Sequence, residues 1–277
     1  MRQRGRRLVP LALLLPATAL ITAVLVLPTA QAIVLAFTDA SGAADLGGIR
    51  AMLGDLAFTD AARNVLVLLL VIFPLQIALA TAIALRLSST VRGAGPFLYL
   101  AAVPLAVSDL AAGLLWLALF TDRGYLNSAL QGAGAITQPI TWLASDNIGG
   151  IIVAVVFAET WRTISIFVIT FLAAVPQSPL VATGSPRTSD LVRPMLRASL
   201  PRAIAIRALL VLQTFALVFA LAGRNLPVLA GQAYERFAAN RDEHASAAYV
   251  VVILALGVIA SVLYLRSAVH RNAVIAA

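Results

Sequence analysis

Six apolar stretches, each long enough to cross a lipid bilayer, constrain this chain more than any other feature of its sequence. A membrane-spanning helix needs about 20 consecutive, mostly apolar residues. Because the bilayer core offers no water to backbone N–H and C=O groups, such stretches fold as helices. The sequence therefore predicts an all-α membrane protein with six transmembrane helices, at about 8–37, 64–85, 95–120, 148–175, 203–222 and 247–265.

The composition excludes several classes of protein. Hydrophobic residues make up 61% of the chain and charged residues 12%, whereas soluble domains have roughly 45–50% and about 25%. A soluble enzyme, a disordered protein and a coiled coil are thereby excluded. Without cysteine or lysine, the chain has no thiol chemistry and no lysine-dependent nucleotide-binding loop. His244 and His270 are far apart, and neither H-E-x-x-H nor G-x-S-x-G occurs. We expect no catalytic residue, metal site or cofactor.

The first apolar stretch resembles a cleaved signal peptide in two respects. The basic segment 1–7 precedes it, and Ala30-Gln31-Ala32 fits a cleavage site of small residues. However, the apolar run over 8–27 is longer than the usual 7–15 residues of a signal peptide. We therefore favour a retained span.

The distribution of arginine predicts the orientation in the membrane, because cytoplasmic loops carry an excess of basic residues. With a cytoplasmic N-terminus, the inner segments hold 12 arginines and one acid, Asp190; these segments are 1–7, 86–94, 176–202 and 266–277. The outer segments hold six arginines and nine acids; they are 38–63, 121–147 and 223–246. The N-terminus (1–7) and the tail (267–277) are therefore expected in the cytoplasm, in agreement with an even number of spans.

The connecting segments also carry structural signals. Apolar residues recur at helical spacing within 48–63, which predicts a short helix on the outer membrane surface. Glycines and a proline within 121–147 predict irregular structure. The long inner segment 176–202 contains five prolines, so we expect short helical pieces there.

Ionisable residues inside the spans are the candidates for function. Asp109 lies in the middle of the third span, where a charge costs about 2.5–3.5 kcal/mol on insertion scales. It is either a residue of a transport pathway or a buried structural carboxylate. Glu159 and Arg162 are three residues apart, on one helical face, and can pair with each other. They form either a structural ion pair or one wall of a substrate cavity.

Neutral polar residues also interrupt the spans. Gln76, Gln213 and Thr214 are better explained by hydrogen bonds between helices than by contacts with a ligand, although Gln213 stays a pathway candidate. Pro74 and Pro104 are expected to kink their spans.

A family resemblance emerges from residues taken in order. It rests on Asn64-Val65-Leu66, Pro74-Leu75-Gln76, Ala84-Leu85, Arg92-Gly93, Pro104, Ala112-Gly113-Leu114-Leu115-Trp116, Phe120, Gly124, Leu126-Asn127, Trp142-Leu143, Glu159-Thr160-Trp161-Arg162, Val175-Pro176 and Leu200-Pro201. Over roughly residues 8–266 the chain resembles the permease subunits of binding-protein-dependent ABC importers, sugar type, such as those for maltose, glycerol phosphate and trehalose. The resemblance implies a type I permease fold and one permease domain over 8–266.

The chain departs from this family in the cytoplasmic loop that couples the permease to its ATPase, 176–202. The family pattern reads E-A-A, three residues, then G, and ends in L-P. Aligned from Val175-Pro176, the pattern falls on Val181, Ala182, Thr183 and Arg187; aligned from Leu200-Pro201, it falls on Ala182, Thr183, Gly184 and Thr188. Neither alignment supplies the glutamate or the glycine. Coupling residues are therefore expected among Val181, Ala182, Thr183, Gly184, Arg187, Thr188, Leu200 and Pro201.

The resemblance also implies a function and partners. The chain would be a non-enzymatic permease subunit in the cytoplasmic membrane, half of a heterodimer with a second permease. An ATPase dimer would bind it from the cytoplasm, and a solute-binding protein would deliver a sugar or sugar derivative from outside. One alternative is a secondary transporter that uses Asp109 and Glu159 as ion carriers, although such folds often show inverted repeats, which we do not find. An intramembrane enzyme is a further alternative, but the chain offers almost none of the motifs it needs.

Overall fold

The computed structural model describes residues 14–88, 94–174, 188–212 and 214–275. Within these ranges the regular structure is helical, apart from one isolated antiparallel bridge between Thr38 and Ala44. The predicted all-α class is therefore confirmed. By internal contacts the chain divides into two compact units: unit 1 comprises residues 1–55 and 232–252, and unit 2 comprises 56–231 and 253–277.

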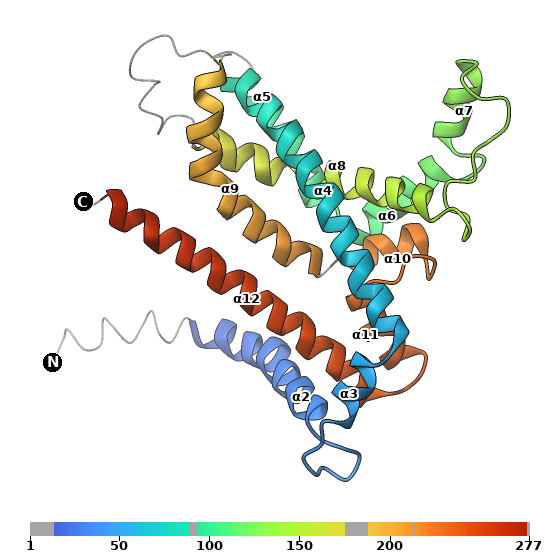
Figure 1. Ribbon diagram of the computed structural model, residues 1–277, viewed down its shortest axis with the longest axis vertical. Coiled ribbons are helices and arrows are strands. Elements are labelled where there is room, and N and C mark those ends of the chain that lie inside the picture. The colour runs from blue at the N-terminus through green and yellow to red at the C-terminus, as the bar shows by residue number, and fades with distance from the viewer. Residues whose placement is uncertain (1–13, 89–93, 175–187, 213, 276–277) are drawn as a thin grey trace. The chain divides into compact units, whose positions relative to one another are not determined.

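Unit 2 is built around α8 (Ile148–Leu172) (Figure 1). Of the long apolar helices it is the most deeply buried. The helix α4 (Leu56–Ser88) packs along it. Four further helices contact α8, namely α5 (Ala94–Ala106), α6 (Asp109–Phe120), α9 (Thr188–Leu212) and α10 (Ala216–Ala222). A side chain on α8 therefore has neighbours on several other helices.

Small and aromatic side chains interlock where α4, α8 and α9 meet. Ala80 and Ala84 of α4 leave room for Phe167 and Phe171 of α8, whose ring centroids lie 5.8 Å apart, edge to face. Ala203 of α9 belongs to the same buried cluster. Close packing of this kind holds the three helices together through dispersion contacts.

Unit 1 contains the helix Leu14–Ala36, which includes a π-helical turn (Thr22–Val26) and α2 (Leu27–Ala36). It also contains α3 (Gly47–Leu53), most of α11 (Leu229–Ala238) and the first turns of α12 (Glu243–Ile275). Polar contacts join these pieces. The Nδ1 atom of His244 lies 2.9 Å from the carbonyl oxygen of Leu35, and Arg236 forms an ion pair with Asp55.

The loop after α2 is shaped by Asp39. Its carboxylate accepts hydrogen bonds from the Ser41 hydroxyl at 2.6 Å and from the backbone N–H groups of Ser41 and Ala43. These donors, the Ser41 hydroxyl foremost, hold the pKa of Asp39 below its ordinary value.

Four helices are long and apolar enough to cross a membrane: Leu14–Ala36, Leu56–Leu87, Ile148–Leu172 and Glu243–Val262. They correspond to the first, second, fourth and sixth predicted spans. The third predicted span is a pair of helical segments, Gly95–Ala106 and Asp109–Gly132, bent by 99° at the break between them. The described residues thus contain four spans, or five if the bent pair is one, and six are not confirmed.

The fifth predicted span is interrupted. In place of one helix over 203–222, α9 ends at Leu212 and α10 begins at Ala216, with the non-helical Thr214 and Phe215 between them. Four arginines in the sequence of α9, Arg193, Arg197, Arg202 and Arg207, make it much less apolar than the four spanning helices.

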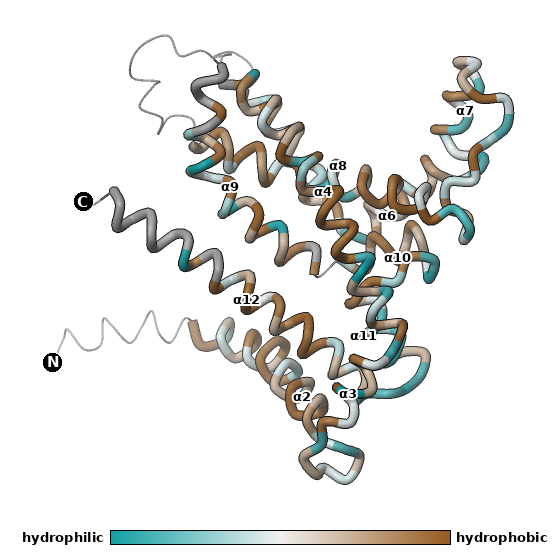
Figure 2. Tube along the Cα trace, in the orientation of Figure 1, coloured by the Kyte–Doolittle hydropathy of each residue, from teal (hydrophilic) through white to brown (hydrophobic). Residues whose placement is uncertain are grey.

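The loop predictions were partly right. The segment 48–63 does contain a short helix, because most of α3 lies in it and ends at Leu53. The long helix α4 then begins at Leu56. The segment 121–147 is irregular except for α7 (Tyr125–Gly132). The prediction of short pieces over 176–202 was wrong for 188–202, where α9 is continuous through Pro194 and Pro201; residues 176–187 lie outside the described ranges. Figure 2 shows hydrophilic residues concentrated in the loops around α7 and α11, and hydrophobic residues along the long helices.

Candidate functional site

The most deeply buried charges of unit 2 are Glu159 on α8 and Arg207 on α9. The Nη2 atom of Arg207 donates a hydrogen bond to Oε2 of Glu159 at 2.6 Å. Neither side chain is more than 1% exposed. In such surroundings each charge needs the other, because an unpaired buried charge is strongly destabilising.

Glu159 also reaches the break between α9 and α10. Its second oxygen, Oε1, accepts a hydrogen bond from the Thr214 hydroxyl at 3.3 Å. The same hydroxyl lies 3.1 Å from the carbonyl oxygen of Leu210, in the last turn of α9. One carboxylate on α8 therefore binds both α9, through Arg207, and Thr214, the second residue after the end of that helix.

Two nitrogen donors of the Arg207 guanidinium are not used in hydrogen bonds among the described residues. Its Nε and Nη1 atoms have no hydrogen-bond partner among the described residues, although both are buried. Leaving a buried donor unsatisfied costs roughly 1–3 kcal/mol. The centre of unit 2 can therefore supply further hydrogen bonds to a polar group that comes within reach.

A second ion pair joins α6 to α8. The Nη1 atom of Arg162 lies 2.8 Å from Oδ1 of Asp109, and the two side chains are 12% and 32% exposed. Asp109 is the first residue of α6, directly after Ser108, whose hydroxyl caps the helix by accepting from the Ala111 N–H at 3.2 Å. The break in the third predicted span thus places a carboxylate at the positive end of a short helix, where it is favoured.

Gln76 ties α4 to the same region of α8. Its Nε2 atom donates to the Thr163 hydroxyl at 2.9 Å, and that hydroxyl donates to the carbonyl oxygen of Glu159 at 2.7 Å. The expectation that Gln76 and Thr214 form hydrogen bonds between helices is confirmed.

The expected pairing of Glu159 with Arg162 was wrong. Each pairs with a residue on another helix, and no ion pair joins the two to each other in the part of the chain that the structure describes. The sequence analysis also missed Arg207 as a partner. The six predicted spans contain two acids and two arginines in all. This equal number of opposite charges was the signal in the sequence that each acid could pair with an arginine.

The coupling residues are only partly described. Val181, Ala182, Thr183, Gly184 and Arg187 lie outside the described ranges, as does Gln213. Thr188, Leu200 and Pro201 belong to α9, with Leu200 packed against the core shared by α4, α8 and α9 and Pro201 exposed.

The chain is similar in sequence to curated transport proteins, although no protein-family model matches it. It is 28% identical over 254 residues to the xylose/arabinose import permease protein XacH of Haloferax volcanii, covering 83% of this chain and 79% of that protein. It is 24% identical over 283 residues to the sulfoquinovosyl glycerol transport system permease protein SmoG of Agrobacterium fabrum, covering 95% and 91%. A match to the lactose transport system permease protein LacF of Rhizobium radiobacter is 27% identical but spans only 54% of that protein's length.

Solved structures resemble the chain over almost its whole length. A chain of a bacterial ABC transporter involved in the import of the acidic polysaccharide alginate gives a TM-score of 0.69 at 17% identity, covering 96% of this chain and 98% of its own. A chain of the alginate transporter in complex with an alginate pentasaccharide-bound periplasmic protein gives 0.71 at 15% identity.

These comparisons confirm the resemblance to sugar-type ABC importer permeases that the sequence motifs indicated. The chain has the fold of an ABC importer permease, and with its long apolar helices it is a multi-pass membrane protein. They give no support to the alternative of a secondary transporter.

Proposed function

We propose that this chain is the permease subunit of an ATP-driven importer that moves a sugar or sugar derivative across the cytoplasmic membrane. The observation that carries the proposal is similarity to sugar import permeases over most of the chain, in sequence and in fold together. The chain itself carries out no chemical step. ATP is hydrolysed on a separate subunit, and the permease converts that hydrolysis into movement of its helices.

The solute passes close to the charged residues of unit 2. Glu159 and Arg162 belong to α8, the central helix, and Asp109 pairs with Arg162. We add Gln213, which lies outside the described residues, as a further candidate. The Asp109–Arg162 pair is the accessible one, and it offers both acceptors and donors to the hydroxyl groups of a sugar. The Glu159–Arg207 pair is closed in this structure and holds the interrupted helix in place.

Three kinds of partner complete the importer. A second permease subunit forms a heterodimer with this chain, an ATPase dimer binds from the cytoplasm, and a solute-binding protein delivers the solute from outside. The helix Leu14–Ala36 supports the first of these, because almost none of it is buried within the chain and its apolar surface needs a cover of lipid or protein. The binding protein is supported by the periplasmic protein present in the complex of the structural relative.

The ATPase acts through the segment that leads into α9. The coupling candidates Val181, Ala182, Thr183, Gly184 and Arg187 come directly before this helix. The backbone then continues as one helix from Thr188 to Leu212, past Arg207. A displacement at the start of α9 therefore travels along a continuous helix to the Glu159 carboxylate.

Coupling is tested by placing a bulky charge in the loop. The variant Thr183→Arg should lose ATPase subunit from the purified complex and lose solute uptake, because a long charged side chain replaces a small one at the expected contact. The matched control is Thr137→Arg, the same change in the predicted outer segment. Full ATPase content and uptake in Thr183→Arg would show that the loop does not dock there, and equal losses in Thr137→Arg would show a general folding defect.

A further inference from the structure

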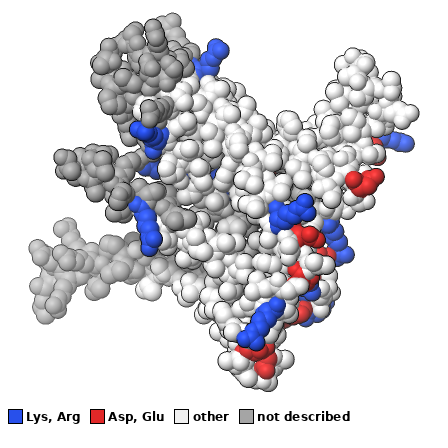
Figure 3. All heavy atoms as spheres, in the orientation of Figure 1, with Lys and Arg blue, Asp and Glu red and all other residues white. Residues whose placement is uncertain are grey.

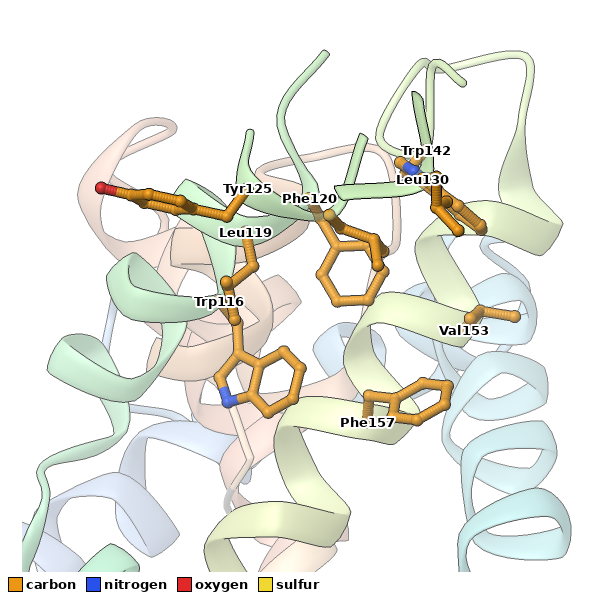
Figure 4. A pocket seen from close by; sticks show the side chains of 9 residues that line it. Trp116, Leu119, Phe120, Tyr125, Leu130, Trp142, Val153 and Phe157 are labelled. Atoms are coloured by element: carbon orange, nitrogen blue, oxygen red, sulfur yellow. The ribbon is translucent and has the colours of Figure 1, made fainter. Parts of the chain in front are cut away.

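An apolar groove of about 550 Å³ lies between α6, α7 and α8, apart from the charged residues of unit 2 (Figure 4). Trp116 and Phe120 of α6 line it, with ring centroids 5.9 Å apart. Val153 and Phe157 of α8 and Leu130 of α7 also belong to the lining. The volume is within the range of pockets that hold small molecules, about 300–1,000 Å³.

Trp142, one of the lining residues, is held in place by Asn127, which is 1% exposed. Its side-chain oxygen accepts from Trp142 Nε1 at 3.2 Å and from the Ile140 N–H at 3.1 Å, while its amide nitrogen donates to the Ile140 carbonyl at 2.9 Å. These bonds tie the loop after α7 to the start of that helix. Trp142 is held with its polar atom in this network and its ring against Phe120.

The lining of the groove does not suit a sugar. None of its side chains is charged or carries an amide, and the indole N–H of Trp142 is already used. The indole nitrogen of Trp116 is buried and has no partner among the described residues, but it lies on the edge of the ring that faces away from Phe120 and Phe157 in Figure 4. The Tyr125 hydroxyl points away from the groove in Figure 4. A sugar held there would leave hydroxyl groups without hydrogen bonds, and each such group costs roughly 1–3 kcal/mol. The groove therefore favours an occupant that has no polar groups.

The groove is continuous with surface that the membrane must cover. Val153 and Phe157 are 38% and 53% exposed on α8, a helix long and apolar enough to span a bilayer. Tryptophan and tyrosine are enriched at the boundary between the apolar core and the polar surface of a membrane. Trp142 has the contacts expected there, since its indole N–H donates to Asn127 and its ring packs against Phe120. We propose that this groove holds one acyl chain of a membrane lipid, which enters from the surrounding bilayer beside α8.

The proposal rests on the membrane-spanning character of the chain and is independent of the solute. Its test uses the purified, assembled transporter in bilayers that contain a trace of phosphatidylcholine with a photoactivatable diazirine on one acyl chain. After irradiation, cross-linked residues are mapped by mass spectrometry. Labelling of Val153, Phe157 and Leu130 should exceed several-fold the labelling of Leu66 and Leu70, exposed residues of α4 that meet bulk lipid.

Two variants fill the groove from two different helices, α8 and α7, so that if one variant fails to fold the other still gives a test. Val153→Phe and Leu130→Trp should each lower groove labelling several-fold and leave labelling of α4 unchanged. The matched control is Val71→Phe, the same substitution at an exposed position on α4, which should leave groove labelling unchanged.

Three results would overturn the proposal. Groove labelling no higher than that of α4 would mean that only bulk lipid touches these residues. Labelling that falls when sugar is added would assign the groove to the solute. Labelling seen in the isolated chain but absent from the assembled transporter would assign it to a protein partner.

Discussion

Glu159 and Asp109 are both carboxylates paired with arginine, but Glu159 is buried and Asp109 is partly exposed. This difference determines how much each carboxylate contributes to the stability of the fold. Glu159→Gln would leave Arg207 buried without its counter-charge, which costs about 3–5 kcal/mol. The Asp109–Arg162 pair is partly exposed, so the long side chain of Arg162 has room to turn to other polar groups when the Asp109 charge is removed. We therefore expect Glu159→Gln to lower the thermal unfolding temperature of the purified protein far more than Asp109→Asn. The double variant Glu159→Gln/Arg207→Met should recover much of the loss, and equal effects of the two single variants would contradict this reading.

Asp109 has a second test, in transport. If the Asp109–Arg162 pair offers hydrogen bonds to a passing sugar, Asp109→Asn should assemble normally but change the rate or the apparent affinity of uptake. The measurement is radiolabelled uptake into vesicles at several solute concentrations, normalised to the amount of assembled complex. Unchanged kinetics would leave Asp109 with a structural role at most.

The residues of the site were predictable, but their partners were not. Asp109, Glu159 and Arg162 stood out in the sequence because a charge inside an apolar span is costly and needs a reason. Spacing along one helix then favoured the pair Glu159–Arg162. The actual pairs depend on which helices pack against α8 beside Glu159 and beside Arg162, namely α9 and α6. The spacing of residues within α8 does not show which helices these are.

At the scale of the element, the contact between α6 and α10 leaves no room for a side chain at Gly113. A Cβ atom there would lie 2.6 Å from Ala220 Cβ and 2.8 Å from the Leu217 carbonyl oxygen, and a backbone atom cannot move aside cheaply. Alanine stabilises a helix by about 1 kcal/mol relative to glycine. Replacing glycine by alanine is therefore expected to raise stability only where there is space for the added Cβ atom. Gly113→Ala should therefore lower the unfolding temperature. Gly132→Ala, where nothing lies within 4 Å, is the control and should be neutral or stabilising.

The bend in the third predicted span has a cause that can be tested. Pro104 removes a backbone donor near the end of α5, and Ser108 then restarts the chain as α6 by capping its first turn. Ser108→Ala should destabilise the protein by about 1 kcal/mol, the usual contribution of such a cap. Ser108→Thr keeps the hydroxyl and should retain most of the stability in the same unfolding assay. A loss as large in Ser108→Thr as in Ser108→Ala would show that the hydroxyl does not matter.

Spans were predictable where hydropathy alone decides the structure, and less so where backbone chemistry intervenes. The apolar runs around α4 and α8 became single long helices. The runs over 95–120 and 203–222 are as apolar in the sequence, yet both are interrupted. For the first, the sequence indicated a kink at Pro104 but not a turn of 99°. For the second, the Thr214 hydroxyl binds both Leu210 and Glu159 at the break, and the second of these contacts exists only in the folded protein.

At the scale of the whole molecule, the predicted orientation rests on the distribution of charge between the segments. Asp109 and Glu159 apart, every acid that the structure describes with its side chain belongs to a predicted outer segment. On the face drawn in Figure 3, acidic side chains lie over the loop after α2, over α11 and beside the loop after α7. Since cytoplasmic loops are the ones enriched in basic residues, these three places are expected outside.

The number of crossings follows from the sides on which the termini lie. If only the four continuous spans cross the membrane, both termini lie on the same side. The same holds for six spans, which result if the bent pair α5–α6 and the interrupted pair α9–α10 both cross. If only one of these pairs crosses, there are five spans and the termini lie on opposite sides. A reporter fused after Arg271 should report the cytoplasm, and one inserted near Ala133 should report the outside. A cytoplasmic signal at both positions would mean that neither pair crosses, whereas an outside signal at both would mean that α9–α10 does not cross. A cytoplasmic signal near Ala133 with an outside signal after Arg271 would mean that the orientation is reversed or that the bent pair alone does not cross, and a reporter at the N-terminus separates these two cases.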